Sequence, residues 1–266
     1  MALKVTILGC GSSGGVPRVG QGWGACDPGE PRNRRRRCSI LVEQTGPGGV
    51  TTVLVDTGPD VREQLLDAGV TRLDAVLYTH DHADHTHGID DLRPLVLTMR
   101  RRISVYADEI TAGTLRDRFG YCFASPPGSD YPPIVDLHLF APHEPLAIHG
   151  PGGPLTVMPV PVMHGAGYRA FAFRFNDLLY CPDISALPDN SAQQFEGVHT
   201  LILDALRYTR HPTHLSVDEA LAMVARFQPR LAVLTNLHSD IDYRTIAGRL
   251  PDGVVTAHDG LMLDVP

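Results

Sequence analysis

The sequence predicts an α/β (α+β) protein whose layers form a four-layer αββα sandwich, built by a single domain over residues 1–266. The length suits one large domain, and 43% hydrophobic residues are enough to fill a sizeable core. Strand-like apolar runs followed by helical patterns occur twice along the chain, which predicts that each half supplies one sheet and its helices. No linker-like segment of low complexity separates the halves, so we expect them to share one domain.

Composition limits the partners and the surroundings of the protein. The net charge of −7 argues against binding of a long nucleic acid, because nucleic-acid phosphates need basic partners. No apolar run reaches the roughly 18 residues of a membrane span, and the first residues lack a secretory pattern. The five cysteines are dispersed without a C-x-x-C pair, which is typical of reduced thiols. We therefore expect a cytoplasmic protein without membrane contact.

The first predicted strand, residues 5–8, leads into a glycine-rich loop. Residues 9–14 read G-C-G-S-S-G, a literal match to the G-x-G-x-x-G pattern of dinucleotide-binding folds. That pattern requires a helix to begin at once, whereas Gly15, Pro17 and further glycines follow here. We therefore reject a dinucleotide site. The glycines instead allow the backbone to approach a ligand or the metal loop closely, unless the loop has no ligand contact at all.

Five arginines lie within residues 32–37, just before a strand predicted at 38–43. Such a charge run is commonly solvated, but alternate residues of a strand face opposite sides. Arg35 and Arg37 are therefore candidates to point inward and hold a loop or a phosphate. The other elements expected in this half are strands at 50–56, 73–78 and 103–106, helices at 60–68, 88–102 and 108–119, and an irregular segment at 121–133 that is a candidate substrate contact near the mouth of the site.

The densest chemistry follows the strand at 73–78, in the loop that contains His80, His82, Asp84 and His85. A loop at the carboxyl end of a strand is where α/β proteins carry their function. Neutral imidazoles and carboxylates are ligands of borderline divalent ions such as zinc, manganese or iron. Four such side chains exceed what one tetrahedral site with an open position needs. The loop therefore predicts two divalent metal ions, and Zn²⁺ or Mn²⁺ are the ions we expect.

The second half again has strands that end in polar residues. A strand at 155–162 leads to His164, and a strand at 178–181 leads to Asp183. A lone histidine is usually a core or surface residue, and the position of His164 at a strand end becomes informative only with the resemblance described below. The other elements expected here are strands at 134–140, 145–149, 168–175, 199–204, 231–234 and 254–257, a helix at 217–227 with Ser216 as its N-cap, and a helix at 242–250.

Four stretches carry a resemblance to a known family. The metal loop reads His80-x-His82-x-Asp84-His85, and the others are residues 8–17, 34–39 and 55–59. These stretches resemble the metallo-β-lactamase superfamily, and within it the PhnP-like branch that includes the phosphoribosyl 1,2-cyclic phosphate phosphodiesterase. The resemblance extends from residue 7 to residue 260. It implies a four-layer sandwich with metal ions along the edge that the two sheets share.

The resemblance also implies roles for individual residues. One metal ion would be bound by His80, His82, His164 and Asp183, and the other by Asp84, His85, Asp183 and His238. Asp84 would also orient the nucleophile. His214 would protonate the leaving group, unless it is a plain surface histidine, because an imidazole titrates near neutrality. Asp56 and Asp204 would accept hydrogen bonds from histidines of the site.

The chain departs from its relatives at two places. Many relatives carry the last metal ligand directly after Thr235, where this chain has Asn236. His238 keeps the same side-chain parity, so we assign the ligand to it, although the sequence leaves open whether Asn236 or His238 holds that position. Phosphodiesterase relatives often bind a structural zinc through closely spaced cysteines in the early loop, where this chain has only Cys26. We therefore predict that this structural zinc is absent.

These observations predict a binuclear-metal-dependent hydrolase. The most favoured activity is that of a phosphoric diester hydrolase, which cleaves a small nucleotide-like or cyclic phosphate ester through a metal-bridging hydroxide. The alternatives are a nuclease similar to tRNA 3′-processing enzymes, a thioester or lactam hydrolase, and a non-catalytic metal-dependent nucleotide-binding protein. Those nucleases rely on an extended basic arm, and no such segment is visible here. The expected partner is a small phosphate ester, and the sequence allows a homodimer without specifying one.

Overall fold

The computed structural model describes residues 2–266 and contains two seven-stranded sheets. Their strand orders are β14-β1-β2-β3-β4-β5-β6 and β13-β12-β11-β10-β9-β8-β7. The strands are β1 (Leu3–Gly9), β2 (Ser39–Gly46), β3 (Gly49–Val55), β4 (Ala75–Leu77), β5 (Ile103–Ala107), β6 (Val135–Leu139), β7 (Leu146–Ile148), β8 (Leu155–Met163), β9 (Arg169–Phe175), β10 (Leu178–Cys181), β11 (Thr200–Asp204), β12 (Leu231–Thr235), β13 (Val254–Thr256) and β14 (Met262–Val265). The helices are α1 (Val61–Asp67), α2 (Ala83–Thr86), α3 (Arg93–Met99), α4 (Glu109–Phe123), α5 (Asp189–Ala192), α6 (Val217–Phe227) and α7 (Tyr243–Ala247), with 3₁₀ turns η1 (Pro31–Asn33), η2 (Ile89–Leu92) and η3 (Gln193–Phe195).

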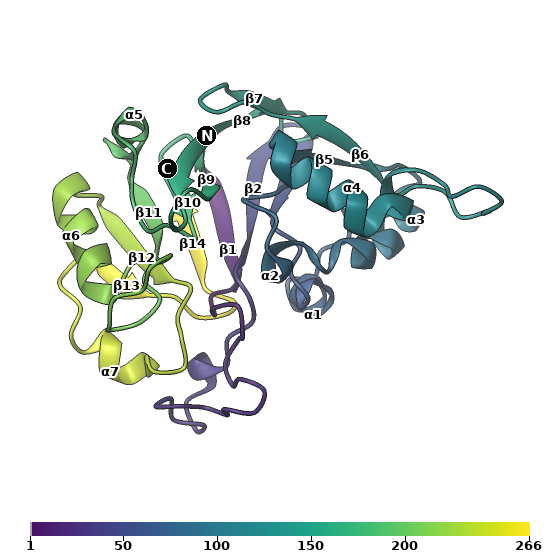
Figure 1. Cartoon of the computed structure of the whole chain (residues 1–266). Helices are drawn as coiled ribbons and strands as arrows, with labels where there is room; N and C mark the ends of the chain where they lie inside the picture. The colour runs from purple at the N-terminus through teal and green to yellow at the C-terminus, as the bar shows by residue number, and fades with distance from the viewer. Residues whose placement is uncertain (1) are drawn as a thin grey trace.

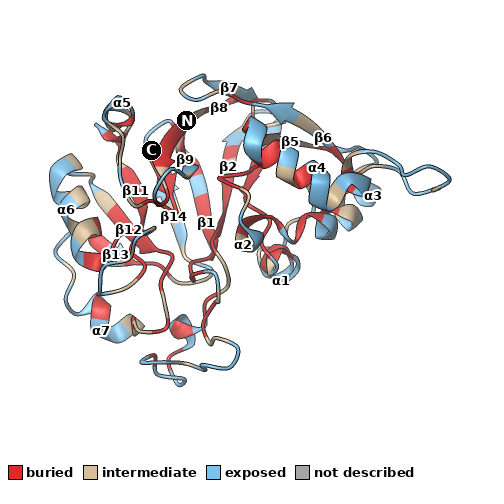
Figure 2. Cartoon of the chain, viewed as in Figure 1, coloured by how far each residue is buried: buried red, intermediate tan, exposed pale blue. Residues whose placement is uncertain are grey.

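Three clusters of buried side chains show how the layers pack. Neighbouring residues Leu54 and Val55 of β3 belong to different clusters, because successive side chains of a strand point to opposite faces. Val55 packs between the two sheets with Phe173 of β9, whereas Leu54 packs under the helices α1, α3 and α4. A third cluster joins the other sheet to α6 and α7. Figures 1 and 2 show buried strands in the middle and helices on both outer sides, which confirms the αββα sandwich.

Both sheets contain a parallel half whose loops carry polar residues. Strands β3, β4, β5 and β6 run parallel, and so do β10, β11, β12 and β13. Parallel strands expose all their carboxyl ends at one edge of the sheet, which is the usual place for ligands in α/β proteins. Predicted site residues follow the parallel strands β3, β4, β10, β11 and β12, so the topology gathers them at these edges, and His164 joins them from the end of β8, which pairs antiparallel with β9.

Several predicted boundaries differ from the structure. The helix expected at 88–102 is divided into η2 and α3, where Pro94 occupies the first turn of α3 and Arg100 ends it in a left-handed conformation with φ 54°. The irregular segment expected at 121–133 begins as the last turn of α4. Its loop projects away from the sheets at the right of Figure 1 and contributes no residue to the lining of the site cavity described below, and its role as a substrate contact stays a prediction.

The last strand was not expected from the sequence. Strand β14 pairs antiparallel with β1, with Leu3 opposite Val265. The first sheet therefore takes one edge strand from the end of the chain, and the prediction that each half builds its own sheet is wrong at this point. The short alternating pattern of β14 gave no signal because three of its four residues are at least partly exposed.

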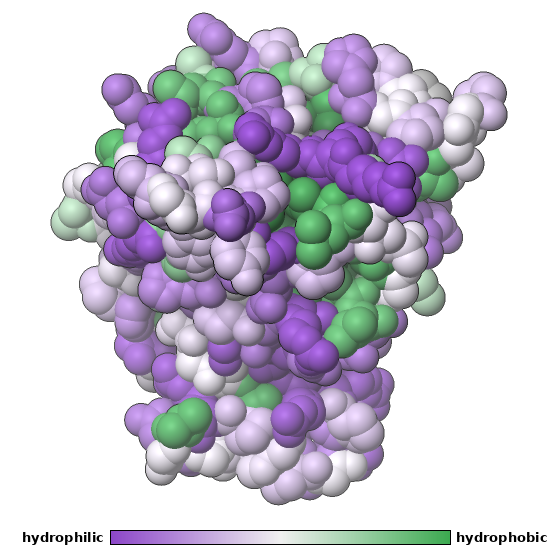
Figure 3. Space-filling view, turned by 90° about the vertical axis from the view of Figure 1, so that its right-hand side faces the viewer, coloured by the Kyte–Doolittle hydropathy of each residue, from purple (hydrophilic) through white to green (hydrophobic). Residues whose placement is uncertain are grey.

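The surface adds two observations. No helix of residues 2–266 is both long and apolar enough to cross a membrane. On the face that Figure 3 shows, hydrophobic residues are interspersed with hydrophilic ones.

Candidate metal centre

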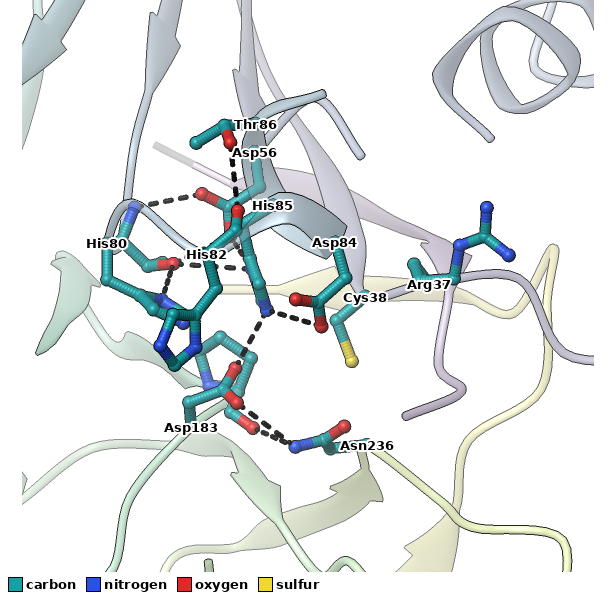
Figure 4. Close-up of polar contacts among 12 residues, drawn as sticks. Arg37, Cys38, Asp56, His80, His82, Asp84, His85, Thr86, Asp183 and Asn236 are labelled. Atoms are coloured by element: carbon teal, nitrogen blue, oxygen red, sulfur yellow. Dashed lines mark hydrogen bonds and ion pairs between the residues drawn. The ribbon is translucent and has the colours of Figure 1, made fainter. Parts of the chain in front are cut away.

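The loop after β4 brings its ligand-type side chains together with residues from the second sheet. Donor atoms of His80, His82 and His164 lie within 4.8 Å of one another, and so do those of His80, His85 and Asp183. A third group of the same kind consists of His164, Asp183 and His214. Figure 4 shows His80, His82, His85 and Asp183 pointing toward a common centre. The three groups share members, as expected of a site built for more than one ion.

Unpartnered buried atoms show that these residues fit a metal ion. Among residues 2–266, the Nε2 atom of His80 and the Oδ2 atom of Asp183 are buried and accept no hydrogen bond. Buried polar atoms are nearly always satisfied, so an imidazole nitrogen without a partner, and a carboxylate oxygen whose near neighbour is Nε2 of His85 at 3.2 Å, call for a cation. Imidazole and carboxylate together form the donor set that borderline divalent ions prefer.

The protonation states also suit metal binding. Burial lowers the pKa of His80 far below its usual value, and the neighbouring histidines add to this effect, so the imidazole is neutral. Burial likewise lowers the pKa of His164. Burial alone would raise the pKa of Asp183, but His85, whose Nε2 lies 3.2 Å from Oδ2, outweighs it and holds that pKa well below the usual range. Ligands must be deprotonated to bind a metal, and these three are.

Asp56 supports the loop from below, as predicted. Its carboxylate oxygen Oδ2 lies 2.7 Å from Nδ1 of His85 and accepts a hydrogen bond of 2.8 Å from the hydroxyl of Thr79. That hydroxyl has a single proton, so it must accept from Nδ1 of His80, 3.0 Å away. Both contacts leave the Nε2 atoms of the two histidines directed to the metal position. Asp56 itself has a φ of 65°, an uncommon backbone conformation at a strand end that carries function.

Replacement of Asp56 by asparagine is expected to weaken metal binding by about 10- to 100-fold, because a neutral amide orients His85 less firmly than a carboxylate does. The fold should persist, since the amide is nearly isosteric with the carboxyl group. Competition with a chromogenic chelator would measure the metal affinity, and Asp252→Asn, at an exposed position, is the control. An affinity equal to that of the wild type would show that Asp56 does not act through His85.

Two residues that the sequence did not single out position His82. The ring of Tyr168 stacks on His82 with centroids 4.9 Å apart and an interplanar angle of 10°. The Tyr168 hydroxyl donates to Asp81, which also accepts a hydrogen bond of 2.7 Å from Thr114. Asp81 lies inside the histidine motif, so its position was a usable signal. Tyr168 could not be found this way, because it meets His82 only through the packing of β9 against the loop.

His214 contacts Asp204, which the sequence marked as a candidate hydrogen-bond acceptor without naming its partner. Its Nδ1 lies 2.9 Å from Oδ2 of Asp204, and its ring centroid lies 4.6 Å from that of His164. Burial opposes protonation of His214, but Asp204 and Asp183 outweigh it and raise its pKa to about 9. The imidazole therefore carries a proton at neutral pH. Its role as a general acid stays a prediction.

The structure departs from the prediction for His238. The parity argument assumed extended backbone, whereas Asn236 has a φ of 61° and turns the chain. Consequently Asn236 points to the site, where its Nδ2 donates to Asp183 (3.3 Å) and Asp204 (3.2 Å). The Nδ1 of His238 lies 3.1 Å from Asp240, and its Nε2 contacts Arg18. Within the described chain, none of the three ligand groups contains His238.

Asp84 lies beside these groups and not within them. Its Oδ2 is 3.3 Å from Nε2 of His85. Burial would raise the pKa of Asp84, but His85 more than compensates and lowers it. Asp84 therefore remains an ionised carboxylate at the edge of the cluster, where Figure 4 shows it next to His85.

The centre opens into a cavity of about 340 Å³. The side chains of the metal centre that line this cavity are His82, Asp84, His164, Asp183 and His214. The remaining lining comes from the glycine-rich loop and from the segments after β11 and β12, and includes Ser12, Ser13, Arg18, Leu206, Arg207, His211, Thr213 and His238. Metal-ligand side chains and two arginines thus face one small space.

Comparison with known proteins identifies the family. A family model described as a beta-lactamase superfamily domain matches residues 51–236, which contain the metal loop, His164 and Asp183. The chain belongs to the metallo-β-lactamase superfamily. The crystal structure of a diphosphatase from the PhnP family superposes with a TM-score of 0.88, at 36% identity over 99% of this chain and 97% of that chain. The chain is therefore also a member of the PhnP family within the metallo-β-lactamase superfamily, as the motifs indicated.

Two curated relatives match over part of their own length. The chain is 31% identical to an octanoyltransferase of Porphyromonas gingivalis, over 97% of this chain and 51% of that protein. It is 37% identical to a ribonuclease Z of Bradyrhizobium, over 32% of this chain and 27% of that protein. The chain spans about half or less of these relatives, so their names describe longer proteins. The PhnP-family match and the fold thus place the chain in a superfamily of metal-dependent hydrolases, and its ligand groups fit a divalent metal ion.

Proposed function

We propose that the protein is a phosphodiesterase-type hydrolase that cleaves a phosphoric ester or diphosphate linkage in a small, nucleotide-like substrate. The observation that supports this proposal is that His82, His164 and Asp183 of the ligand groups line the same small cavity as the protonated His214. A space of about 340 Å³ suits a small molecule rather than a polymer. The 36% identity to a PhnP-family diphosphatase supports phosphorus as the reacting atom.

We assign two divalent ions to the site, Zn²⁺ or Mn²⁺. His80, His82 and His164 would hold one, and His85 with Asp84 would hold the other. Asp183 would bind both, because each carboxylate oxygen can bind a different ion. Divalent ions bound in this way lower the pKa of water and polarise a phosphoryl oxygen.

The side chains of the chain then divide the remaining work. Asp84 orients the attacking water, since its carboxylate is ionised and borders the cavity. Asp56 keeps His85 in place through Nδ1, at 2.7 Å, and leaves Nε2 facing Asp183. As the oxygen of water forms a bond to phosphorus, the bond to the leaving oxygen breaks. His214 donates its proton to that oxygen, and Asp204 stabilises the imidazolium before transfer.

A panel of substrates tests this proposal against the chemistry of other members of the superfamily. Metal-reconstituted protein should hydrolyse bis-p-nitrophenyl phosphate and at least one cyclic nucleotide or nucleoside diphosphate, and should leave a β-lactam and an octanoyl thioester intact. His80→Ala is the matched inactive control, because it removes a member of two ligand groups. Turnover of the thioester alone would overturn the proposal in favour of acyl chemistry. Cleavage of tRNA precursors without cleavage of small diesters would point to a nuclease.

A further inference from the structure

We propose that strand β6 pairs antiparallel with β6 of a second copy of this chain, so that the first sheets of two molecules join into one continuous sheet. Strand β6 ends its sheet, where it pairs with β5 and lies beside α4 (Figure 1). None of its residues lines the cavity of the metal centre, so the inference does not depend on the proposed function. The sequence allowed a homodimer, and this edge supplies a surface for it.

Strand β6 is the longest of the four sheet edges in the described chain. It has five residues, whereas β14 has four and β7 and β13 have three each. Proteins usually keep sheet edges short or interrupt them with lysine or proline, because an open edge pairs with other chains. The residues of β6, V-D-L-H-L, include neither, and Leu139 is 57% exposed. This edge is therefore the one least protected against pairing.

Alternate residues of β6 direct their backbone groups away from β5. The amide of Ile103 donates to the carbonyl oxygen of Ile134 (3.1 Å), so the even-numbered residues of β6 bond to β5. The odd-numbered residues face outward, and no hydrogen bond from elsewhere in residues 2–266 reaches their backbone groups. These outward residues are Val135, Leu137 and Leu139.

The outward residues are spaced so that β6 can pair with itself. An antiparallel register centred on Leu137 sets this residue opposite its own copy, and Val135 opposite Leu139 of the second copy. All three are then hydrogen-bonded positions, at which opposing residues exchange both their N–H···O bonds. The register relates the two molecules by a twofold axis, which is the commonest symmetry of protein dimers.

The same register is electrostatically complementary. It sets Asp136 opposite His138 of the second copy, and symmetry repeats this pair on the other side of the axis. These are non-hydrogen-bonded positions, where opposing side chains approach most closely. Asp136 is available, because its side chain is 52% exposed although it pairs with Arg102 at 3.0 Å. A register centred on Asp136 would instead set two aspartates against each other, which is unfavourable.

The opposite face of β6 offers an apolar contact. Val135 and Leu137 pack under the helices, and Leu139 has the same parity along the strand. A cavity of about 420 Å³ is lined there by residues of α4 and β6, among them Phe123, Val135 and Leu137. In the proposed pairing, Leu139 of the second copy lies opposite Val135 on this face. Its exposed side chain is thus brought to a cavity with apolar walls.

Sedimentation of the full chain over a range of concentrations tests the dimer. We expect the wild type to reach twice the mass of one chain. Leu139→Lys should raise the dissociation constant of the dimer by about 100-fold, because it removes an apolar contact from both sides of the axis. Met262→Lys is the matched control, since Met262 is 63% exposed on the edge strand β14, and it should leave the constant unchanged.

A swap of two residues tests the register. His138→Asp sets like charges opposite each other twice and should weaken the dimer by about 10-fold. The double variant Asp136→His/His138→Asp restores both pairs and should recover the wild-type constant. Both variants lose the stacking of His138 on Tyr106, so recovery in the second reports on the cross-strand pair. Circular dichroism should show native secondary structure in each of these variants.

Each alternative outcome contradicts the inference. A wild type that stays monomeric at every concentration would overturn it and leave the edge to an extended peptide of another protein. An unchanged dissociation constant in Leu139→Lys would place the interface elsewhere on the surface. A swap variant that dimerises no better than His138→Asp would reject the register centred on Leu137.

Discussion

Replacement of Asp183 by alanine is expected to abolish hydrolysis and to reduce the bound metal more than any other single change in the site. Asp183 belongs to two of the three ligand groups, and its unpartnered Oδ2 is buried beside His85. Its removal deprives both proposed ions of a ligand. Metal-ion catalysis contributes several kcal/mol, so kcat/KM should fall by roughly 10³-fold or more. Elemental analysis of purified protein and assays with bis-p-nitrophenyl phosphate would measure the two effects.

Two controls make this result interpretable. Asp252→Ala, at an exposed position, should change neither metal content nor rate. Circular dichroism of Asp183→Ala should show native secondary structure, because the residue follows β10 and lies outside the three hydrophobic clusters. A variant that keeps two equivalents of metal and wild-type turnover would show that the centre described here is not the active site.

His214→Ala should slow the enzyme selectively for substrates with poor leaving groups. A general acid contributes about 10²–10⁴-fold when the departing oxygen needs a proton. An acidic p-nitrophenol departs without such help, so bis-p-nitrophenyl phosphate should be affected much less than an alkyl ester. The contact of 2.9 Å with Asp204, which keeps the imidazole protonated, is the physical basis of this expectation. Rates over a series of leaving groups of increasing basicity would measure it.

The comparison between leaving groups decides the role of His214. Equal losses for p-nitrophenyl and alkyl esters would contradict proton donation, and a parallel loss of metal would instead make His214 a ligand with His164 and Asp183. Asp204→Asn is the companion variant, since it leaves the imidazole in place and removes the charge that favours its proton. It should shift the selectivity in the same direction as His214→Ala and by a smaller factor.

Local sequence patterns and the family resemblance were sufficient to predict the four layers of the fold and most residues of the metal centre. The motif from His80 to His85 specifies its own chemistry, because the spacing of ligands along a loop is visible in the sequence. His164 and Asp183 each directly follow an apolar strand, but it was the resemblance to the family that marked them as ligands. The structure brings His80, His82, His85, His164 and Asp183 together as expected, with Asp84 at the edge.

Features that depend on backbone turns or on distant pairing could not be predicted in this way. The extended backbone on which the parity of His238 rests is absent, because Asn236 adopts a left-handed conformation that no spacing rule reveals, and the assignment of His238 as a ligand stays a prediction. Arg18 meets His238 across 220 residues of sequence, and Tyr168 meets His82 only through packing. The helix expected at 88–102 is divided just before Pro94, which lies in the first turn of α3. A proline at this position is compatible with a continuous helix and with a new helix, so the sequence did not reveal the division.

The pairing of β14 with β1 has a consequence for how the molecule is made. Strand β1 is synthesised long before its outer neighbour β14, which comprises residues 262–265. Until those residues are available, β1 presents a row of open backbone donors and acceptors, the kind of edge at which sheets aggregate. Ribosome-bound chains that lack this final strand should therefore depend on chaperones more strongly than the finished molecule does.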